Sequence, residues 1–332
     1  MKAMLRTSGL RLRELVFADL VDERAHELLF LMGNSLGTLN RFTEALEYFT
    51  RLEVDLTRAL GSEHVDTLFA RGRAAWWQFK NGDLAGAMAA EEELLLDRLR
   101  LLGPDHEETL LARDDLAWLR GEAGDASEAI DAYLELIPDW ERARGADNTR
   151  TLEARAFLAY WRKQAGDPAT AAAELAALLD DRARALGPEH ADTLATRFEL
   201  GDCLGESGNE AAAAEAHREL LSIRTRLQGP DHAFTLDVHF KYARWLGLSG
   251  DAAGAVAEYE KLLPDLARVF GPDAEDTLLA RNNLAHFRSV ATGDRAAAVA
   301  EYESLLVDVE RVYGPDHPNT TLVGGNLAAM RE

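Results

Sequence analysis

The feature that most constrains this chain is a loop glycine that recurs with a fixed period. Six of these glycines are spaced 42 residues apart and a seventh follows after 43 residues: Gly61, Gly103, Gly145, Gly187, Gly229, Gly271 and Gly314. A fixed period of roughly 20–50 residues is typical of a solenoid, in which each unit packs against its sequence neighbours. Within each period, two stretches carry apolar residues every three or four positions, so each period predicts a pair of helices.

Three columns of small and apolar residues predict how these helices pack. The second helix carries an alanine column, Ala45, Ala87, Ala129, Ala171, Ala213, Ala255 and Ala298, and a leucine column, Leu52, Leu94, Leu136, Leu178, Leu220, Leu262 and Leu305. The first helix carries a small-residue column, Gly33, Ala75, Ala117, Ala159, Gly201, Ala243, Ala285 and Ala328. Small residues let helix axes approach closely, and leucine fills the layer beneath. We therefore expect all three columns to be buried.

The turns inside the repeats are equally regular. Most first helices end at a Gly-Asp pair: Gly82-Asp83, Gly124-Asp125, Gly166-Asp167, Gly250-Asp251 and Gly293-Asp294. The glycine is suited to end one helix, and the aspartate is suited to cap the next. At the other loop, Asp105 with Glu108, and Glu189 with Asp192, have the spacing of capping pairs.

These columns, the Gly-Asp turn and the loop sequence GPDH with its following Thr-Leu pair resemble the tetratricopeptide repeat (TPR), in the 42-residue form found in kinesin light chains and many bacterial proteins. HEAT and armadillo repeats have similar lengths but lack this combination of columns. The resemblance implies an all-α fold, namely an α-solenoid in which antiparallel helix pairs form a right-handed superhelix.

The repeat phase predicts how the chain is divided. Residues 1–21 are expected to form an N-terminal capping helix, and residues 314–332 an unpaired C-terminal helix of an incomplete eighth unit. Seven units lie between them, at about 22–60, 64–102, 106–144, 148–186, 190–228, 232–270 and 274–313. The last helix ends in apolar residues, so either the chain continues in a longer protein or this end packs on another molecule. The C-terminal helix is therefore a candidate surface for self-association.

The composition restricts the classes of partner and compartment. The net charge of −22 argues against binding to nucleic acids and anionic membranes. Cys203 is the single cysteine, which fits a reducing compartment. The sequence has no apolar run of membrane-spanning length, and residues 1–17 lack the apolar core of a signal peptide. We expect a cytoplasmic protein, and the scarcity of lysine beside abundant alanine suggests a bacterial one.

The resemblance also implies a binding surface. In tetratricopeptide proteins the first helices line the concave groove, and the residue after the small-residue column faces it. This position is occupied here by Asn34, Trp76, Trp118, Tyr160, Asp202, Arg244 and His286, and the same face should include Phe30, Phe69, Phe79, Asp114, Phe198 and Phe240. A row of exposed aromatic rings suits apolar or proline-bearing peptides. The alternative is that these rings belong to the core between helices.

One first helix matches a further motif of the family. Kinesin light chains and related binders hold a peptide backbone with an Asn-Asn-Leu-Ala sequence, which occurs here at residues 282–285. The resemblance therefore adds Asn282 and Asn283 to the predicted binding residues. The corresponding pairs in other repeats are different, such as Asp114-Asp115 and Phe240-Lys241.

The charges on this face define the predicted partner. Acidic residues (Glu27, Asp114, Glu122, Glu153, Glu206 and Asp237) outnumber basic ones (Lys80, Lys163 and Arg244). The sequence thus predicts a non-enzymatic scaffold without a cofactor that binds a protein or peptide with apolar or aromatic and some basic character. The alternative is a regulatory or sensor module of a larger bacterial signalling or transcription-regulating protein, acting by intramolecular contact.

Two polar columns have both a functional and a structural interpretation. The loop histidines His64, His106, His190, His232 and His317 could suggest a metal, but successive repeats lie roughly 10 Å apart, so the rings cannot converge on one ion. We expect them to stabilise the loops. The arginines Arg71, Arg113, Arg155, Arg197 and Arg281 could bind an acidic ligand, but we expect pairing with the nearby Asp66, Glu108, Asp192 and Asp276. No set of catalytic residues is evident.

Overall fold

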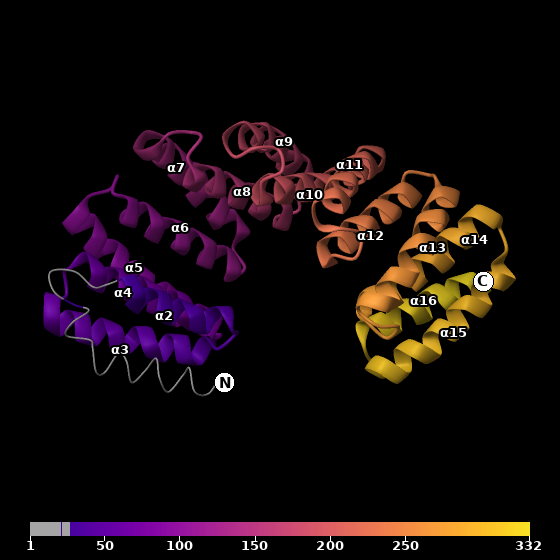
Figure 1. The fold of residues 1–332 in the computed structure, drawn as a ribbon, viewed down its shortest axis with the longest axis horizontal. Coiled ribbons are helices and arrows are strands. Elements are labelled where there is room, and N and C mark those ends of the chain that lie inside the picture. Colours follow the sequence, from indigo (N-terminus) through magenta and orange to yellow (C-terminus); the bar gives the residue numbers. More distant parts are fainter. Residues whose placement is uncertain (1–20, 22–26) are drawn as a thin grey trace. The chain divides into compact units, whose positions relative to one another are not determined.

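The computed structural model describes Val21 and residues 27–332, which contain fifteen helices (Figure 1). The first helices of the repeats are α2 (Glu27–Thr38), α4 (Val65–Lys80), α6 (Glu107–Glu122), α8 (Thr149–Gln164), α10 (Ala191–Glu206), α12 (Ala233–Leu248), α14 (Glu275–Thr292) and α16 (Pro318–Arg331). The second helices are α3 (Phe42–Leu60), α5 (Leu84–Leu102), α7 (Ala126–Arg144), α9 (Pro168–Ala185), α11 (Glu210–Gln228), α13 (Ala252–Val269) and α15 (Arg295–Tyr313). Apart from Val21, the predicted capping helix lies outside the described residues.

The helices form two compact units. The first unit ends at Ala165 and the second begins at Gly166, between the two helices of the predicted repeat 148–186. Within each unit, every helix packs against the next one along the chain. The first helices also touch one another: α4, α6 and α8 in the first unit, and α10, α12, α14 and α16 in the second. We call these the first-helix layers. The predicted all-α repeat solenoid is confirmed, whereas the repeat boundaries and the handedness of the superhelix stay predictions.

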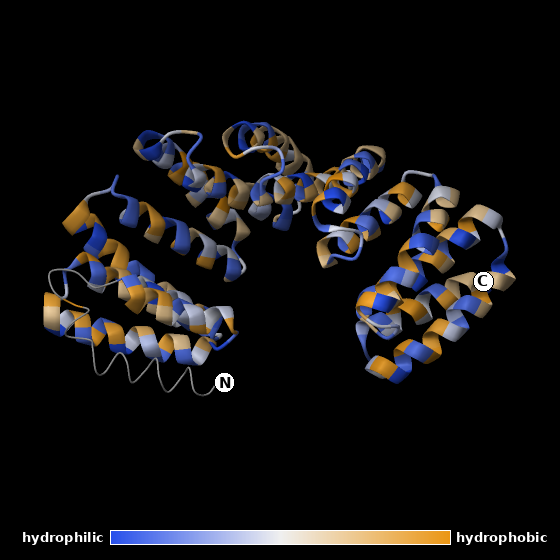
Figure 2. Cartoon of the chain, in the orientation of Figure 1, coloured by the Kyte–Doolittle hydropathy of each residue, from blue (hydrophilic) through white to orange (hydrophobic). Residues whose placement is uncertain are grey.

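The three packing columns behave as predicted. All seven alanines and all seven leucines of the second helices are buried, and so are the small residues of the first helices from Gly33 to Ala285. Ala328, in α16, is exposed. Gly201 shows how close the packing is, because a Cβ atom there would lie 2.3 Å from the His217 ring. Along each helix, hydrophobic residues therefore alternate with hydrophilic ones (Figure 2).

The turns differ from the prediction at one of the two loops. The aspartates after the mid-repeat glycines cap the second helices as predicted; Asp83, for example, accepts a hydrogen bond from the Gly86 amide at 2.9 Å. The expected acidic capping pairs are wrong. His106 caps α6, because its Nδ1 accepts from the Glu108 amide at 3.2 Å. The histidine is the residue that directly precedes the first helical turn, so its ring reaches the unpaired amide.

The histidine cap recurs and confirms the loop-stabilising interpretation. His64, His190, His232 and His317 each accept from the amide two residues further on. In each of these caps Nδ1 of the ring is therefore the acceptor that satisfies an amide of the first helical turn.

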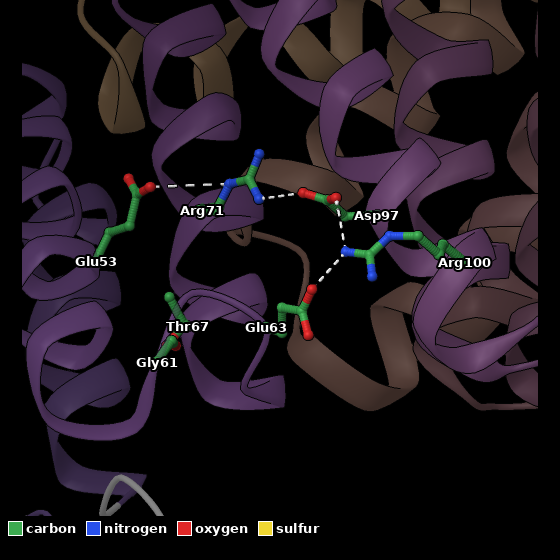
Figure 3. Close-up of polar contacts among 7 residues, drawn as sticks. All are labelled: Glu53, Gly61, Glu63, Thr67, Arg71, Asp97 and Arg100. Atoms are coloured by element: carbon green, nitrogen blue, oxygen red, sulfur yellow. Dashed lines mark hydrogen bonds and ion pairs between the residues drawn. The ribbon is translucent and has the colours of Figure 1, made fainter.

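A second set of polar contacts connects each loop to the helices around it (Figure 3). The Thr67 hydroxyl donates to the Gly61 carbonyl at 2.8 Å, and Arg71 pairs with Asp97 at 2.7 Å. Arg100, in the last turn of α5, pairs with Asp97 and with Glu63 of the preceding loop. The same link between successive loops recurs in the pairs Arg142–Asp105, Arg226–Glu189, Arg268–Asp231 and Arg311–Asp273.

The arginines of the first helices are paired, but not with the predicted carboxylates. Arg71, Arg113 and Arg281 bind Asp97, Asp139 and Asp308 of the second helices, and Arg197 binds Glu219. The predicted partners precede each arginine by five residues on the same helix, so they point to a different side of it.

The threonine contact provides the first testable prediction. Thr193 is buried, and its hydroxyl donates to the Gly187 carbonyl at 2.8 Å. Replacing it by valine keeps the shape but removes the donor, so Thr193→Val should lower the free energy of unfolding by about 1 kcal/mol. Urea unfolding measures this. Thr225→Val, at an exposed position of α11, is the control and should change it by less than about 0.5 kcal/mol. If both variants lowered the free energy of unfolding equally, the Thr193 hydrogen bond would not be the cause.

Candidate functional site

The predicted groove residues lie on the first-helix layers, but they are not equally accessible. In the column that follows the small residues, Tyr160 and His286 are exposed, Asn34, Trp76, Trp118 and Arg244 are half-buried, and Asp202 is buried. The column therefore does not form a uniform surface, and each unit has to be considered by itself.

The first unit has an aromatic cluster formed by Trp118, Phe157, Tyr160 and Trp161. The Trp118 ring stacks on Tyr160 with centroids 5.3 Å apart, and it meets Phe157 and Trp161 edge-on or tilted at 5.1 Å. Trp161 is buried, whereas Tyr160 is 37% exposed. The cluster thus has one side in the core and one at the surface. Trp118 is therefore neither fully exposed, as a groove residue would be, nor fully buried, as a core residue would be.

Smaller aromatic contacts precede this cluster along the chain. Phe30 of α2 meets Phe69 of α4 edge-on at 4.9 Å. Trp76 packs against Phe79 at 5.5 Å, and the Lys80 ammonium lies 5.7 Å from the Trp76 ring centroid. All four rings are half-buried. They extend the apolar character of the first-helix layer toward α2.

Two carboxyl groups lie on the same helix as Trp118. Burial, together with the neighbouring charge of Asp115, raises the pKa of Asp114 to about 7. Burial raises the pKa of Asp115 to about 6, although Arg73 and Arg98 oppose it. Oδ1 of Asp114 is buried without a hydrogen-bond donor among the described residues. A buried carboxylate oxygen without a donor favours the protonated carboxyl group, in keeping with the raised pKa of Asp114.

In the second unit, the structure corrects two predicted binding residues. Asp202 is 4% exposed and accepts hydrogen bonds from Lys241 at 2.7 Å and from Trp245 Nε1 at 3.2 Å. Asn282 is also buried; its amide donates to Asn283 and its carbonyl accepts from Asn326. Side chains of the following repeat cover both residues, so their polar atoms face protein and not an open groove.

The remaining predicted residues of the second unit lie around these networks. Phe198 is edge-on to His217 and Phe240 to Tyr259, and Asn283 donates to the Tyr259 hydroxyl at 3.0 Å. The Arg244 guanidinium lies 4.5 Å from the Trp245 ring centroid, and exposed His286 lies beside Phe287. The second unit therefore has a more polar first-helix layer than the first.

The family follows from the repeat at the C-terminal end. A family model of the tetratricopeptide repeat matches residues 277–319, which include most of α14, all of α15 and the start of α16. The same helix pair, columns and turns recur along the earlier part of the chain. The chain is a tetratricopeptide repeat protein.

Solved structures of low sequence identity share the fold of this tetratricopeptide repeat protein. Nearly identical TPR-like repeats of a putative kinesin light chain from Podosopora anserina are 20% identical, cover 61% of this chain and 95% of theirs, and have a TM-score of 0.54. A signal transduction ATPase with numerous domains from Pyrococcus horikoshii, which has a tetratricopeptide repeat sensor, is 15% identical. The match covers 92% of this chain and 49% of that protein, with a TM-score of 0.62.

A third similar structure is a Rap protein in complex with competence and sporulation factor. It is 12% identical, the match covers 99% of this chain and 94% of that one, and the TM-score is 0.54. No curated protein sequence matches this chain.

One column of residues that contributes to the site of this repeat protein was not predicted from the sequence. It lies three residues before the predicted column and contains Arg73, Asp115, Phe157, Glu199, Lys241 and Asn283, of which only Asn283 was predicted. Phe157 packs on Trp118, and Lys241 binds Asp202. Residues three apart lie on the same side of a helix, so the spacing was a usable signal.

The described residues contain no group of three or more His, Cys, Asp or Glu side chains that could hold a metal ion. None of the described helices is both long enough and apolar enough to span a bilayer. The candidate binding surface of the first unit is the half-exposed aromatic cluster with its neighbouring carboxyl groups.

Proposed function

We propose that this protein is a non-enzymatic binding module whose first unit holds a segment of another polypeptide against its first-helix layer. The observation that supports this proposal is the aromatic cluster, in which Trp118 and Tyr160 stack while Tyr160 remains accessible. Stacked rings with one exposed side offer a large apolar contact at little cost in side-chain entropy.

The partner that fits this surface is apolar or aromatic with some positive charge. A lysine or arginine side chain can lie over the exposed side of the Tyr160 ring, on a unit that also carries Asp114. Because the pKa of Asp114 is raised to about 7, such a cation would also favour the ionised carboxylate, so binding should strengthen as the pH rises through 7. The attraction should weaken with added salt.

A second candidate function is a regulatory or sensor module within a larger bacterial signalling or transcription-regulating protein. The similarity to the Pyrococcus horikoshii ATPase supports it, since the match there spans about half of a multidomain protein. The complete reading frame in the native genome distinguishes this candidate from an independent scaffold. In either case we propose a cytoplasmic location, where the buried thiol of Cys203 stays reduced.

Self-association through α16 also stays a proposal. Leu322, on this helix, is 44% exposed, and Thr320, Val323 and Leu327 are buried. Light scattering of the purified protein, compared with a Leu322→Asn variant, tests whether this surface joins two copies.

The binding proposal predicts a large effect of one exposed ring. Peptides selected from a display library on the purified protein should lose affinity at least about tenfold when Tyr160 is replaced by alanine, because hot spots are commonly aromatic. The melting temperature should change little, since Tyr160 lies at the surface. Phe234→Ala, which removes an exposed ring of α12, is the matched control and should leave affinity unchanged. Equal affinity of the two variants would refute the assignment.

A further inference from the structure

A groove on the second-helix side of the first unit has no role in the function proposed above. It is a cavity of about 280 Å³ between α5 and α7, with α6 as its floor. The lining residues are Leu95 from α5, Arg113, Leu116 and Arg120 from α6, and Glu128, Asp131, Ala132 and Glu135 from α7. We refer to it as the α5–α7 groove.

An apolar strip on α5 begins at Leu95 in the α5–α7 groove and continues beside the groove at the exposed Leu96 and Leu99. Leu95 lines the cavity, and Leu99 follows it by four residues on the same side of α5. Leu96, between them in sequence, is 69% exposed. The core side of α5 is formed by Glu91, Leu94 and Arg98 instead, so the exposed Leu96 and Leu99 are not needed to pack the repeat.

The opposite wall, on α7, is acidic. Glu128, Asp131 and Glu135 all line the cavity and are exposed. None of the three forms an ion pair within the part of the chain that the structure describes, whereas Asp139, one turn beyond Glu135, binds both Arg113 and Arg142. Of the two arginines on the floor of the groove, Arg113 binds Asp139, so Arg120 lies beside three carboxylates. A partner that supplies further positive charge would reduce the repulsion among these carboxylates.

The other repeats serve as internal controls for this pattern. No other second helix has leucine at all three positions of Leu95, Leu96 and Leu99. The residues there are Glu53, Val54 and Thr57 in α3; Ile137, Pro138 and Glu141 in α7; Leu179, Asp180 and Ala183 in α9; Leu221, Ser222 and Thr225 in α11; Leu263, Pro264 and Ala267 in α13; and Leu306, Val307 and Glu310 in α15. No other second helix has an acid at all three positions of Glu128, Asp131 and Glu135. The residues there are Glu44, Glu47 and Arg51 in α3; Gly86, Ala89 and Glu93 in α5; Thr170, Ala173 and Ala177 in α9; Ala212, Glu215 and Glu219 in α11; Gly254, Ala257 and Lys261 in α13; and Ala297, Ala300 and Ser304 in α15. Among these helices, three leucines face three acids only across the α5–α7 groove.

The second unit contains the corresponding cavity without these features. Its volume is about 410 Å³, and Leu263, Arg281 and Leu284 occupy the positions of Leu95, Arg113 and Leu116. The groove itself is thus a consequence of the repeat architecture. The leucine and acid walls are additions to one copy of it.

We propose that the α5–α7 groove docks a helical segment of a partner protein that carries adjacent aliphatic and basic stripes. The aliphatic side chains would cover Leu96 and Leu99, and the basic ones would neutralise Glu128, Asp131 and Glu135. Helices commonly dock in grooves through apolar anchors spaced by three and four residues, while charge complementarity sets their orientation. This surface is separate from the aromatic cluster, so one chain can hold two segments.

Synthetic amphipathic peptides provide the probes for this proposal. The first has a leucine stripe beside a lysine stripe, the second has glutamate in place of the lysines, and the third has glutamine in place of the leucines. Fluorescence anisotropy should show binding of the first peptide, weakened at least tenfold by either change. Binding of the glutamate peptide as tight as that of the lysine peptide would overturn the proposal.

Variants of the protein then locate the bound peptide. The double variant Leu96→Asn and Leu99→Asn should weaken binding at least tenfold, and the triple variant Glu128→Gln, Asp131→Asn and Glu135→Gln should weaken it and reduce its salt dependence. Val307→Asn, at the position of Leu96 in α15 and 65% exposed, is the matched control and should have no effect.

Two further outcomes would overturn the inference. One is unchanged affinity in both groove variants. The other is loss of peptide binding in Tyr160→Ala, which would place the peptide on the first-helix layer and support the proposed function instead. Leu95, which is half-buried, is left intact, and every substituted side chain is exposed, so circular dichroism should be unchanged in every variant.

Discussion

Replacing Glu91 by glutamine should make the first unit more stable than the wild type at pH 8 and leave its stability near pH 5 almost unchanged. Glu91 is 1% exposed, and neither of its carboxyl oxygens has a hydrogen-bond donor among the described residues. Burial and the charge of Asp115 raise its pKa from 4.5 to about 8, although Arg98 and Arg73 act in the opposite direction. Glutamine has the same shape and no charge to bury.

The sign of the pH dependence follows from this raised pKa. Between pH 4.5 and 8 the folded chain keeps a proton on Glu91 that the unfolded chain has lost, so stability falls as the pH rises through this window. The effect is on the order of a few kcal/mol, because one pKa unit corresponds to about 1.4 kcal/mol. Asp114 and Asp115, with pKa values of about 7 and 6, add to it in the same direction.

Urea unfolding between pH 5 and pH 8.5, with hydrogen exchange of α4–α7 as a local measure, tests this prediction. The Glu91→Gln variant should have a flatter stability profile than the wild type, and Glu92→Gln, which changes the exposed neighbour, should match the wild type. Parallel profiles for wild type and Glu91→Gln would mean that Glu91 is ionised and stabilised by the arginines throughout.

Replacing Asp202 by alanine should destabilise the second unit by about 2–4 kcal/mol, because it leaves a lysine and an indole N–H without their acceptor. Lys241 and Trp245 both donate to this carboxylate, and His217 Nε2 lies 3.5 Å from it. Asp202→Asn should cost less, since the amide oxygen still accepts a hydrogen bond. Thermal unfolding followed by circular dichroism measures both.

The same residue should contribute to acid sensitivity. Burial by itself would raise the pKa of Asp202, but the hydrogen bond and charge of Lys241 outweigh it, so the pKa is lowered from 3.8. Its stabilisation is therefore present above pH 3.8 and is lost as the pH falls through the lowered pKa. Asp180→Ala, at an exposed position of α9, is the control. If Asp180→Ala lowered the stability as much as Asp202→Ala does, the hydrogen bonds of Asp202 with Lys241 and Trp245 would not be the cause.

Glu91 breaks the repeat pattern of the second helices. Glu91 occupies a core position that is Phe49, Tyr133, Leu175, His217, Tyr259 or Tyr302 in the other second helices. Comparing the repeats with one another could have identified it as a buried carboxyl from the sequence. The raised pKa, however, depends on how deeply the packed helices bury Glu91 and on the charge of Asp115 from α6, which together outweigh Arg98 of α5 and Arg73 of α4.

The sequence by itself determined the architecture. The period, the alanine and leucine columns and the Asp caps predicted the helix pairs and their core, and the structure confirms them at residues such as Ala171, Leu178 and Asp83. The caps are predictable because a capping side chain binds an amide only two or three residues away. The core is predictable because each repeat packs against a neighbour that has the same alanine and leucine columns.

Only the tertiary structure decided which first-helix residues remain accessible. Asp202 is covered by Lys241 and Asn282 by Asn326, whereas Tyr160 keeps an exposed side. The partners that cover these residues lie about one repeat away and differ from repeat to repeat, so no periodic pattern encodes them. Burial at a repeat interface depends on two particular side chains meeting, and that meeting is set by the packing of one helix on the next.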